Sequence, residues 1–231
     1  MNKLLLLLVA TATSIVSVDA QKIDMTAPNK ITKEQSRVAF LPLMFQENDK
    51  GVREYVLSAR DPYEKALYGV FEKLGMKRLD SAEVNFAWKE LKGATFDTAA
   101  FALPEHTDLV KLGEKLGADY VVVSRCYFNV RSDWQGLGPK TRADATVDLW
   151  IVDVAKKEFA LKADKIFSHS REKAPGWKIA VDLFLAPISA FSGGPKTNHE
   201  KRAGLLSLGK AIQPWLEEME KNGESKIKIG D

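Results

Sequence analysis

The sequence predicts an α/β (α+β) domain in which helices pack on a mixed sheet that contains an antiparallel meander. Three observations predict it. A near-continuous apolar run of strand length spans residues 37–44, and amphipathic helix patterns that end at glycines follow it. Residues 118–130 begin as a strand that is apolar on both faces, and from its second half to residue 168 apolar and polar side chains alternate, which is typical of neighbouring antiparallel strands.

The composition is that of a folded globular protein. Hydrophobic residues make up 45% and charged residues 28% of the 231 positions, which argues against disorder. The formal net charge of +3 is too small to indicate a nucleic-acid partner. After the N-terminus, no stretch of about 20 apolar residues indicates a transmembrane span in the mature chain.

The N-terminus has the pattern of a cleavable secretory signal. A basic start containing Lys3 precedes the apolar run Leu4–Ala10, and Val18 and Ala20 supply the small residues for cleavage before Gln21. The alternative is an uncleaved anchor helix. The expected organisation is a signal peptide at 1–20, a flexible lead at 21–36, a single α/β domain at 37–221 and a polar tail at 222–231. The expected location is the periplasm or the outside of the cell.

The first half of the domain reads as one strand followed by three helices. After the strand at 37–44, residues 45–60 are expected to be a polar loop. Each helix pairs a cap or proline at its start with a glycine at its end. The three helices start at Asp61-Pro62, Ser81 and Thr107 and end at Gly75, Gly93 and Gly117, with a short strand at 76–80 after the first.

The second half reads as the meander and a last helix. The expected strands are 118–130 and 141–154, separated by a turn at 131–140, and a hairpin turn then leads to a third strand ending near 168. The last helix runs from Thr197 or Asn198 to about Glu220, and Pro214 is expected to kink or split it.

Residues 179–191 form an apolar segment that is too short to span a membrane. It is expected either to lie over the core or to form an exposed flap. An exposed flap could contact a partner protein or, peripherally, a membrane surface.

No residue pattern supports catalysis, a cofactor or a metal. His106, His169 and His199 lack metal-ligand spacing, and no nucleophile elbow or phosphate-binding glycine loop is present. Cys126 reads as a small buried hydrophobe, because it lies in an apolar run. Asp148 and Asp153 are expected on opposite strand faces, with Asp153 bonding the backbone of the hairpin turn.

The candidate contact residues are aromatic or apolar. Trp134, Trp150 and Trp177 fall near the meander, where they could bind a sugar or a partner, or form a hydrophobic cluster under residues 176–191. The apolar segment and its flank add Trp177, Phe184, Leu185 and Phe191 as a candidate protein-contact surface.

Several of these segments resemble a known family. The strand "RVAFLPL", the junction "LGADYVVV" and the hairpin "DLWIVDVAKKEF" are similar to the periplasmic α/β family of CsgG-like proteins, LpoB and the TolB N-terminal domain. The resemblance covers about residues 37–168 and implies an anticodon-binding-like or TolB-N-like architecture. The chain lacks the lipid-anchoring Cys of the CsgG and LpoB types, and residues 169–198 lack a long alternating hairpin, so pore formation is not expected.

The resemblance implies an exported, non-enzymatic envelope accessory protein that acts through protein–protein contacts. The alternative is a periplasmic small-ligand or saccharide-binding protein with its site beside Trp134 and Trp150.

The export prediction can be checked directly. Mass spectrometry of the protein from the envelope fraction should find a mature N-terminus at Gln21, because cleavage follows the small residues Val18 and Ala20. An intact Met1 in that fraction would support the anchor helix instead.

Overall fold

The structure is a computed structural model that describes residues 21–25, 36–47, 53–100, 102–135, 138–171 and 198–221. The predicted signal peptide, the predicted polar tail and the apolar segment 179–191 lie outside the described residues. So do Trp177, Phe184, Leu185 and Phe191, and their predicted roles stay predictions.

In the described ranges, seven strands form one mixed sheet with four helices packed on it, which confirms the predicted fold class. The order is β1-β7-β6-β5-β2-β4, and β3 pairs with β5 beyond the end of β2. β2 and β3 run parallel to β5, whereas β5, β6, β7 and β1 are successively antiparallel. The strands are β1 (Lys22–Met25), β2 (Arg37–Phe40), β3 (Met44–Glu47), β4 (Lys77–Arg78), β5 (Tyr120–Gln135), β6 (Gly138–Asp153) and β7 (Glu158–His169).

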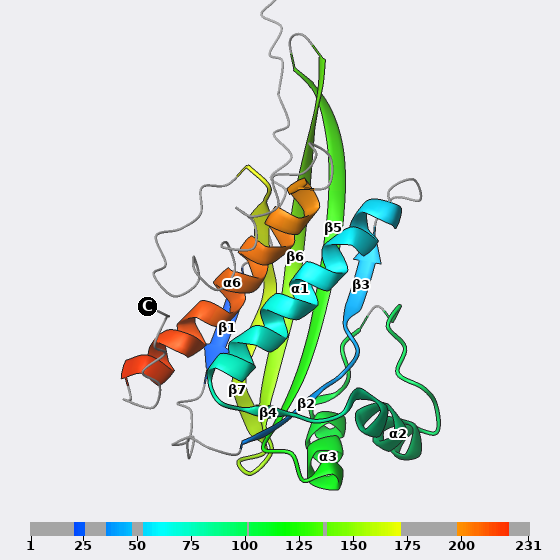
Figure 1. Cartoon of the computed structure of the whole chain (residues 1–231), viewed down its shortest axis with the longest axis vertical. Helices are drawn as coiled ribbons and strands as arrows, with labels where there is room; N and C mark the ends of the chain where they lie inside the picture. Colours follow the sequence, from blue (N-terminus) through cyan, green and yellow to red (C-terminus); the bar gives the residue numbers. More distant parts are fainter. Residues whose placement is uncertain are drawn as a thin grey trace, which may run out of the picture.

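Two unequal helix layers cover the sheet. The long helices α1 (Arg53–Lys73) and α6 (Asn198–Lys221) lie side by side over one face (Figure 1). The shorter helices α2 (Ser81–Lys92) and α3 (His106–Leu116) pack at one end of the opposite face. The first layer builds the larger core cluster, and α2 and α3 build a smaller second cluster against β2, β5 and β6. The two layers explain why the first half of β5 is apolar on both sides.

The predicted strand 37–44 becomes two strands. β2 ends at Phe40, and Pro42 lies in the break before β3 begins at Met44, because proline cannot donate to a ladder. β3 takes up residues 44–47, so the loop predicted for 45–60 is wrong at its beginning.

That loop is also wrong at its end, because α1 begins at Arg53 and carries Pro62 inside it. Proline removes one backbone hydrogen bond from a helix and clashes with the turn before it. A helix therefore rarely extends to the N-terminal side of a proline. Here the turn before Pro62 is held by burial, since Ala59 and Tyr63 are 2% and 1% exposed in the main core. Packing therefore extends the helix beyond the local start signal at Asp61.

Two helix caps differ from the prediction. Asp80, not Ser81, caps α2, because its carboxylate accepts hydrogen bonds from the backbone N–H groups of Ala82 and Glu83. Ser81 instead accepts a hydrogen bond from Arg78. α3 begins at His106, and Glu105 occupies the N-cap position that was predicted for Thr107.

The glycine ends of the helices are confirmed. Gly75, Gly93 and Gly117 all have positive φ values, which glycine adopts without a Cβ clash.

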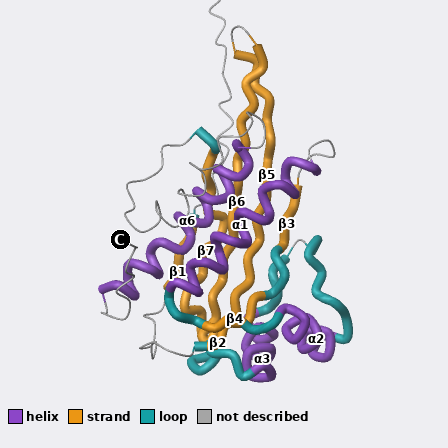
Figure 2. Tube along the Cα trace, in the orientation of Figure 1, coloured by secondary structure: helices purple, strands orange, loops and turns teal. Residues whose placement is uncertain are grey.

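β5 and β6 are longer than predicted and pair from Tyr120↔Asp153 to Gln135↔Gly138. The predicted ten-residue turn at 131–140 is therefore mostly strand. Pro139 is tolerated there, because a strand of a two-stranded ribbon has one side with no ladder to join. The outer part of this ribbon extends beyond the helix layer (Figures 1 and 2).

The hairpin between β6 and β7 is confirmed, and α6 remains one helix although it contains Pro214. The predicted flexible lead is wrong for residues 22–25. These residues form the edge strand β1, which pairs with Leu161–Asp164 of β7. The local sequence of the segment KIDM does not predict a strand. The segment becomes one by pairing with a partner about 140 positions away.

Replacing either of two helix glycines, Gly113 and Gly69, by alanine should change the stability of the fold in opposite directions. A Cβ at Gly113 would clash with Val154 and lie 2.9 Å from Val121, whereas one at Gly69 would meet nothing within 4 Å. We expect Gly113→Ala to lower the free energy of unfolding by about 1–3 kcal/mol through overpacking. The control Gly69→Ala should raise it by about 0.5–1 kcal/mol, since alanine favours a helix. Urea unfolding measures both, and equal effects would contradict the close α3–sheet contact.

Candidate functional site

The face of the sheet opposite α1 and α6 is only partly covered by helices. α2, α3 and the chain between them reach Trp150 and Phe159 at one end of this face. Beyond Trp150, the described part of the chain places no helix on it. We call this region the open face, and define it by Arg125, Tyr127, Thr146, Asp148, Trp150, Lys162, Asp164 and Phe167.

Strand register arranges the open face in rows, because residues paired across strands share a face. One row joins Tyr127, Thr146 and Phe167 from β5, β6 and β7. The next row along the strands pairs Arg125 with Asp148. Phe167 is exposed and Tyr127 half-buried, so the first row offers two aromatic side chains near a polar surface.

Asp148 has hydrogen-bond partners on both neighbouring strands. One carboxylate oxygen accepts from Arg125 Nε at 2.8 Å and Nη2 at 2.5 Å. The other accepts from the backbone N–H of Lys165 at 2.8 Å. Lys165 has a φ of 56° and lies where the β6–β7 register shifts, so Asp148 stabilises a bulge that redirects β7.

The backbone of Asp148 also connects the open face with the helix layer behind it. Its carbonyl accepts a hydrogen bond from Ser124 Oγ at 3.2 Å, and Ser124 Oγ lies 2.7 Å from the Tyr63 hydroxyl of α1. All three groups are buried, so this chain of hydrogen bonds passes through the sheet.

Trp150 is held by three contacts. Its Nε1 donates to Asp164 Oδ1 at 2.6 Å, and its ring meets Phe159 edge-on at 5.2 Å between centroids. Lys162 Nζ lies 5.0 Å from the ring centroid, within cation–π range. Trp150 is therefore a fixed border between the covered end and the open face.

Trp134 and Trp150 do not form one site. Trp150 pairs with Val123, and Trp134 lies eleven residues (123 to 134) further along β5 in the outer ribbon. At about 3.3 Å per residue, the two backbones are about 36 Å apart. The two tryptophans therefore lie far apart, and the predicted saccharide site beside them stays a prediction.

Two titratable side chains of the main core, Cys126 and Tyr63, are held in their neutral forms. Burial raises the pKa of the Cys126 thiol and of the Tyr63 hydroxyl well above their ordinary values. The Cys126 thiol is buried, which confirms its predicted core role. Asp153 accepts the backbone N–H of Lys156 at 3.0 Å, as predicted for the hairpin turn. Within the described ranges, no three His, Cys, Asp or Glu side chains gather as a metal site would require.

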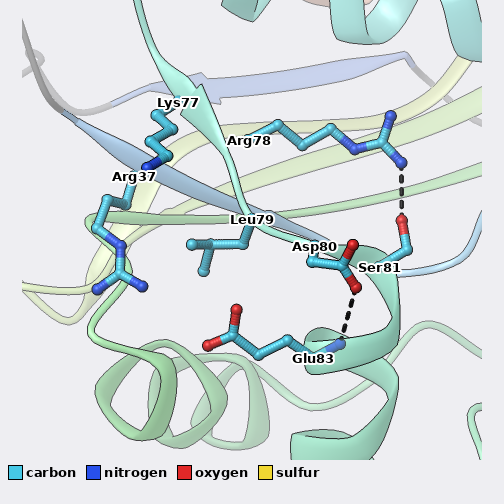
Figure 3. A pocket seen from close by; sticks show the side chains of 7 residues that line it. All are labelled: Arg37, Lys77, Arg78, Leu79, Asp80, Ser81 and Glu83. Carbon is cyan, nitrogen blue, oxygen red and sulfur yellow. Dashed lines mark hydrogen bonds between the residues drawn. The ribbon is translucent and has the colours of Figure 1, made fainter.

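Apart from the open face, a hollow lies where β2, β4 and α2 begin. It has a volume of about 590 Å³ and is lined by Arg37, Lys77, Arg78, Leu79, Asp80, Ser81 and Glu83 (Figure 3). Several of its charged groups already have partners. Arg37 Nη1 donates to the Gly117 carbonyl, Arg78 stacks 3.8 Å from the Tyr68 ring centroid, and Asp80 caps α2. The hollow therefore offers mainly groups that support the surrounding fold.

Comparison with known proteins gives only distant structural likenesses. No family model and no curated protein matches the chain. Similar solved structures include lipoprotein GNA1162 from Neisseria meningitidis, at 13% identity and a TM-score of 0.40, covering 67% of this chain and 96% of that one. The LpoB C-terminal domain from Salmonella enterica has 12% identity and a TM-score of 0.36, covering 59% and 83%. The PelC dodecamer subunit from Paraburkholderia phytofirmans has 11% identity and a TM-score of 0.37, covering 84% and 97%.

LpoB, named in the sequence resemblance, is thus among the similar structures, whereas CsgG-like and TolB-like features stay predictions. None of the helices in the described ranges is long and apolar enough to cross a bilayer.

The sequence identified Trp150 but missed Asp148 and Phe167 as surface-forming residues. A signal for Asp148 is present in the sequence, because alternation along 118–130 and 141–154 puts Arg125 and Tyr127 on one strand face and Asp148 and Trp150 on one face of the next strand. It could not show which of these faces lacks a helix, because that depends on where α2 and α3 pack.

Asp148 predicts a measurable stability effect. Asp148→Asn removes the charge that Arg125 faces and weakens the acceptor for Lys165, so we expect a loss of about 1.5–3 kcal/mol in the free energy of unfolding. The control Glu114→Gln breaks an exposed pair with Lys157 and should cost less than about 1 kcal/mol. Thermal and urea unfolding distinguish the two, and equal losses would contradict the role of Asp148.

Proposed function

We propose that the protein is an exported, non-enzymatic envelope accessory protein that binds a partner protein through the open face. The row formed by Tyr127, Thr146 and Phe167 carries this proposal. It lies across three strands, and Phe167 is 38% exposed at its end.

The chemistry of the open face suits a protein partner. Aromatic side chains are enriched in protein interfaces, because they bury much apolar area at little conformational cost. Here they lie beside charged groups that are already paired, namely Arg125 with Asp148 and Lys162 with Asp164. A partner can therefore cover Tyr127 and Phe167 without leaving these charges unpaired.

The non-enzymatic part of the proposal is supported by the state of two buried nucleophiles among the described residues, Cys126 and Ser124. The buried thiol of Cys126 has a raised pKa and so remains protonated and unreactive at neutral pH. The Ser124 hydroxyl is buried and bonded to Tyr63 rather than to a basic side chain.

Site-specific photo-crosslinking in cells that express the whole chain tests the proposal. A crosslinking residue at position 127 should give one discrete protein adduct. The matched control at Phe86, which is 64% exposed on α2, should not give that adduct. Phe167→Asp should reduce the adduct at 127 about tenfold or more, because it places a charge in the apolar contact.

Two results would contradict the proposal. One is an adduct of equal yield from position 86, which would mean that contact is not confined to the open face. The other is no protein adduct at 127 together with thermal stabilisation by peptidoglycan fragments, which would favour the saccharide-binding alternative. Circular dichroism of the Phe167→Asp protein controls for loss of fold.

A further inference from the structure

β1 forms one edge of the sheet, and the described strands place nothing on its outer side. All four of its residues are exposed. Ile23 and Met25 are 37% and 40% exposed, and they are two of the four large hydrophobic residues exposed in the described ranges. An edge with free backbone groups and apolar side chains is a template for a further strand.

The charges of β1 do not protect this edge. Proteins often block strand addition with an edge lysine, a proline or a bulge. β1 has Lys22, but Asp24 neutralises it at 2.7 Å, and β1 contains no proline. The edge is therefore uncharged overall.

The spacing of these charges is self-complementary. In an antiparallel pair centred on Ile23, Lys22 of one copy lies opposite Asp24 of the other, and the two Ile23 side chains face each other. Opposite charges placed directly across an antiparallel pair attract. Both charged pairs lie on the open-face side, because β1 places Lys22 opposite Asp164 and Asp24 opposite Lys162.

We propose that β1 pairs with β1 of a second copy of this chain, which joins the two sheets edge to edge about a two-fold axis. Such an axis is perpendicular to the sheets, so the open faces of both copies lie on the same side of the dimer. The paired edge has four residues on each side, which makes the interface small and the association concentration-dependent.

Two charge variants test the pairing in the protein isolated from cells that express the whole chain. Lys22→Asp places two carboxylates opposite each other, and Asp24→Lys places two ammonium groups opposite each other. We expect each variant alone to dissociate at least about tenfold more readily than the unchanged protein. An equimolar mixture should restore dimers, because the aspartate introduced in one variant then faces the lysine introduced in the other.

Sedimentation velocity over a concentration series measures the dissociation constants. The matched control is Lys157→Asp, an exposed charge change in the turn after β6, which should leave dimerisation unchanged. Restoration by mixing distinguishes the proposed contact from the ion pair within β1, since mixing cannot repair a contact within one chain.

The proposal would be overturned by any of three results: a monomeric unchanged protein, equal association of all variants, or a mixture that stays monomeric. Each of these outcomes leaves the open-face function to be judged by its own crosslinking test.

Discussion

The path of the central strands depends on the hydrogen bonds that the buried carboxylate of Asp148 accepts. This carboxylate binds Arg125 on β5 and the backbone of Lys165 on β7, so a single side chain fixes three neighbouring strands. A non-glycine residue with positive φ costs roughly 1–2 kcal/mol, and the hydrogen bond from Lys165 offsets this cost. Through Ser124 and Tyr63, the same residue is connected to α1 on the other side of the sheet.

The unequal helix layers explain why this protein has an open face at all. α1 and α6 are 21 and 24 residues long and cover the strands along much of their length, whereas α2 and α3 have 12 and 11 residues and cover one end. The strands adapt to this difference. β5 is apolar on both faces where both layers are present, and polar or aromatic on one face where α2 and α3, the described helices of the second layer, do not reach.

The sequence predicted those parts of the fold that depend on neighbouring residues. Gly75, Gly93 and Gly117 end their helices because each terminus needs a left-handed residue. Features that depend on distant contacts were missed. α1 continues past Pro62 to Arg53, through a turn in which Ala59 is buried, and β1 is a strand because it pairs with β7. For the candidate site, alternation identified the residues of one strand face, but the bulge at Lys165 and the extent of α2 and α3 determine which face is open.

The outer ribbon of β5 and β6 has a thermodynamic consequence. From Arg131↔Arg142 to Gln135↔Gly138 the two strands pair with each other and with no other described strand, and the outer part of the ribbon extends beyond the helix layer (Figure 1). Two strands alone are marginally stable in water. The ribbon can therefore open locally without unfolding of the domain. Its conformation can change with its surroundings while the other strands stay paired.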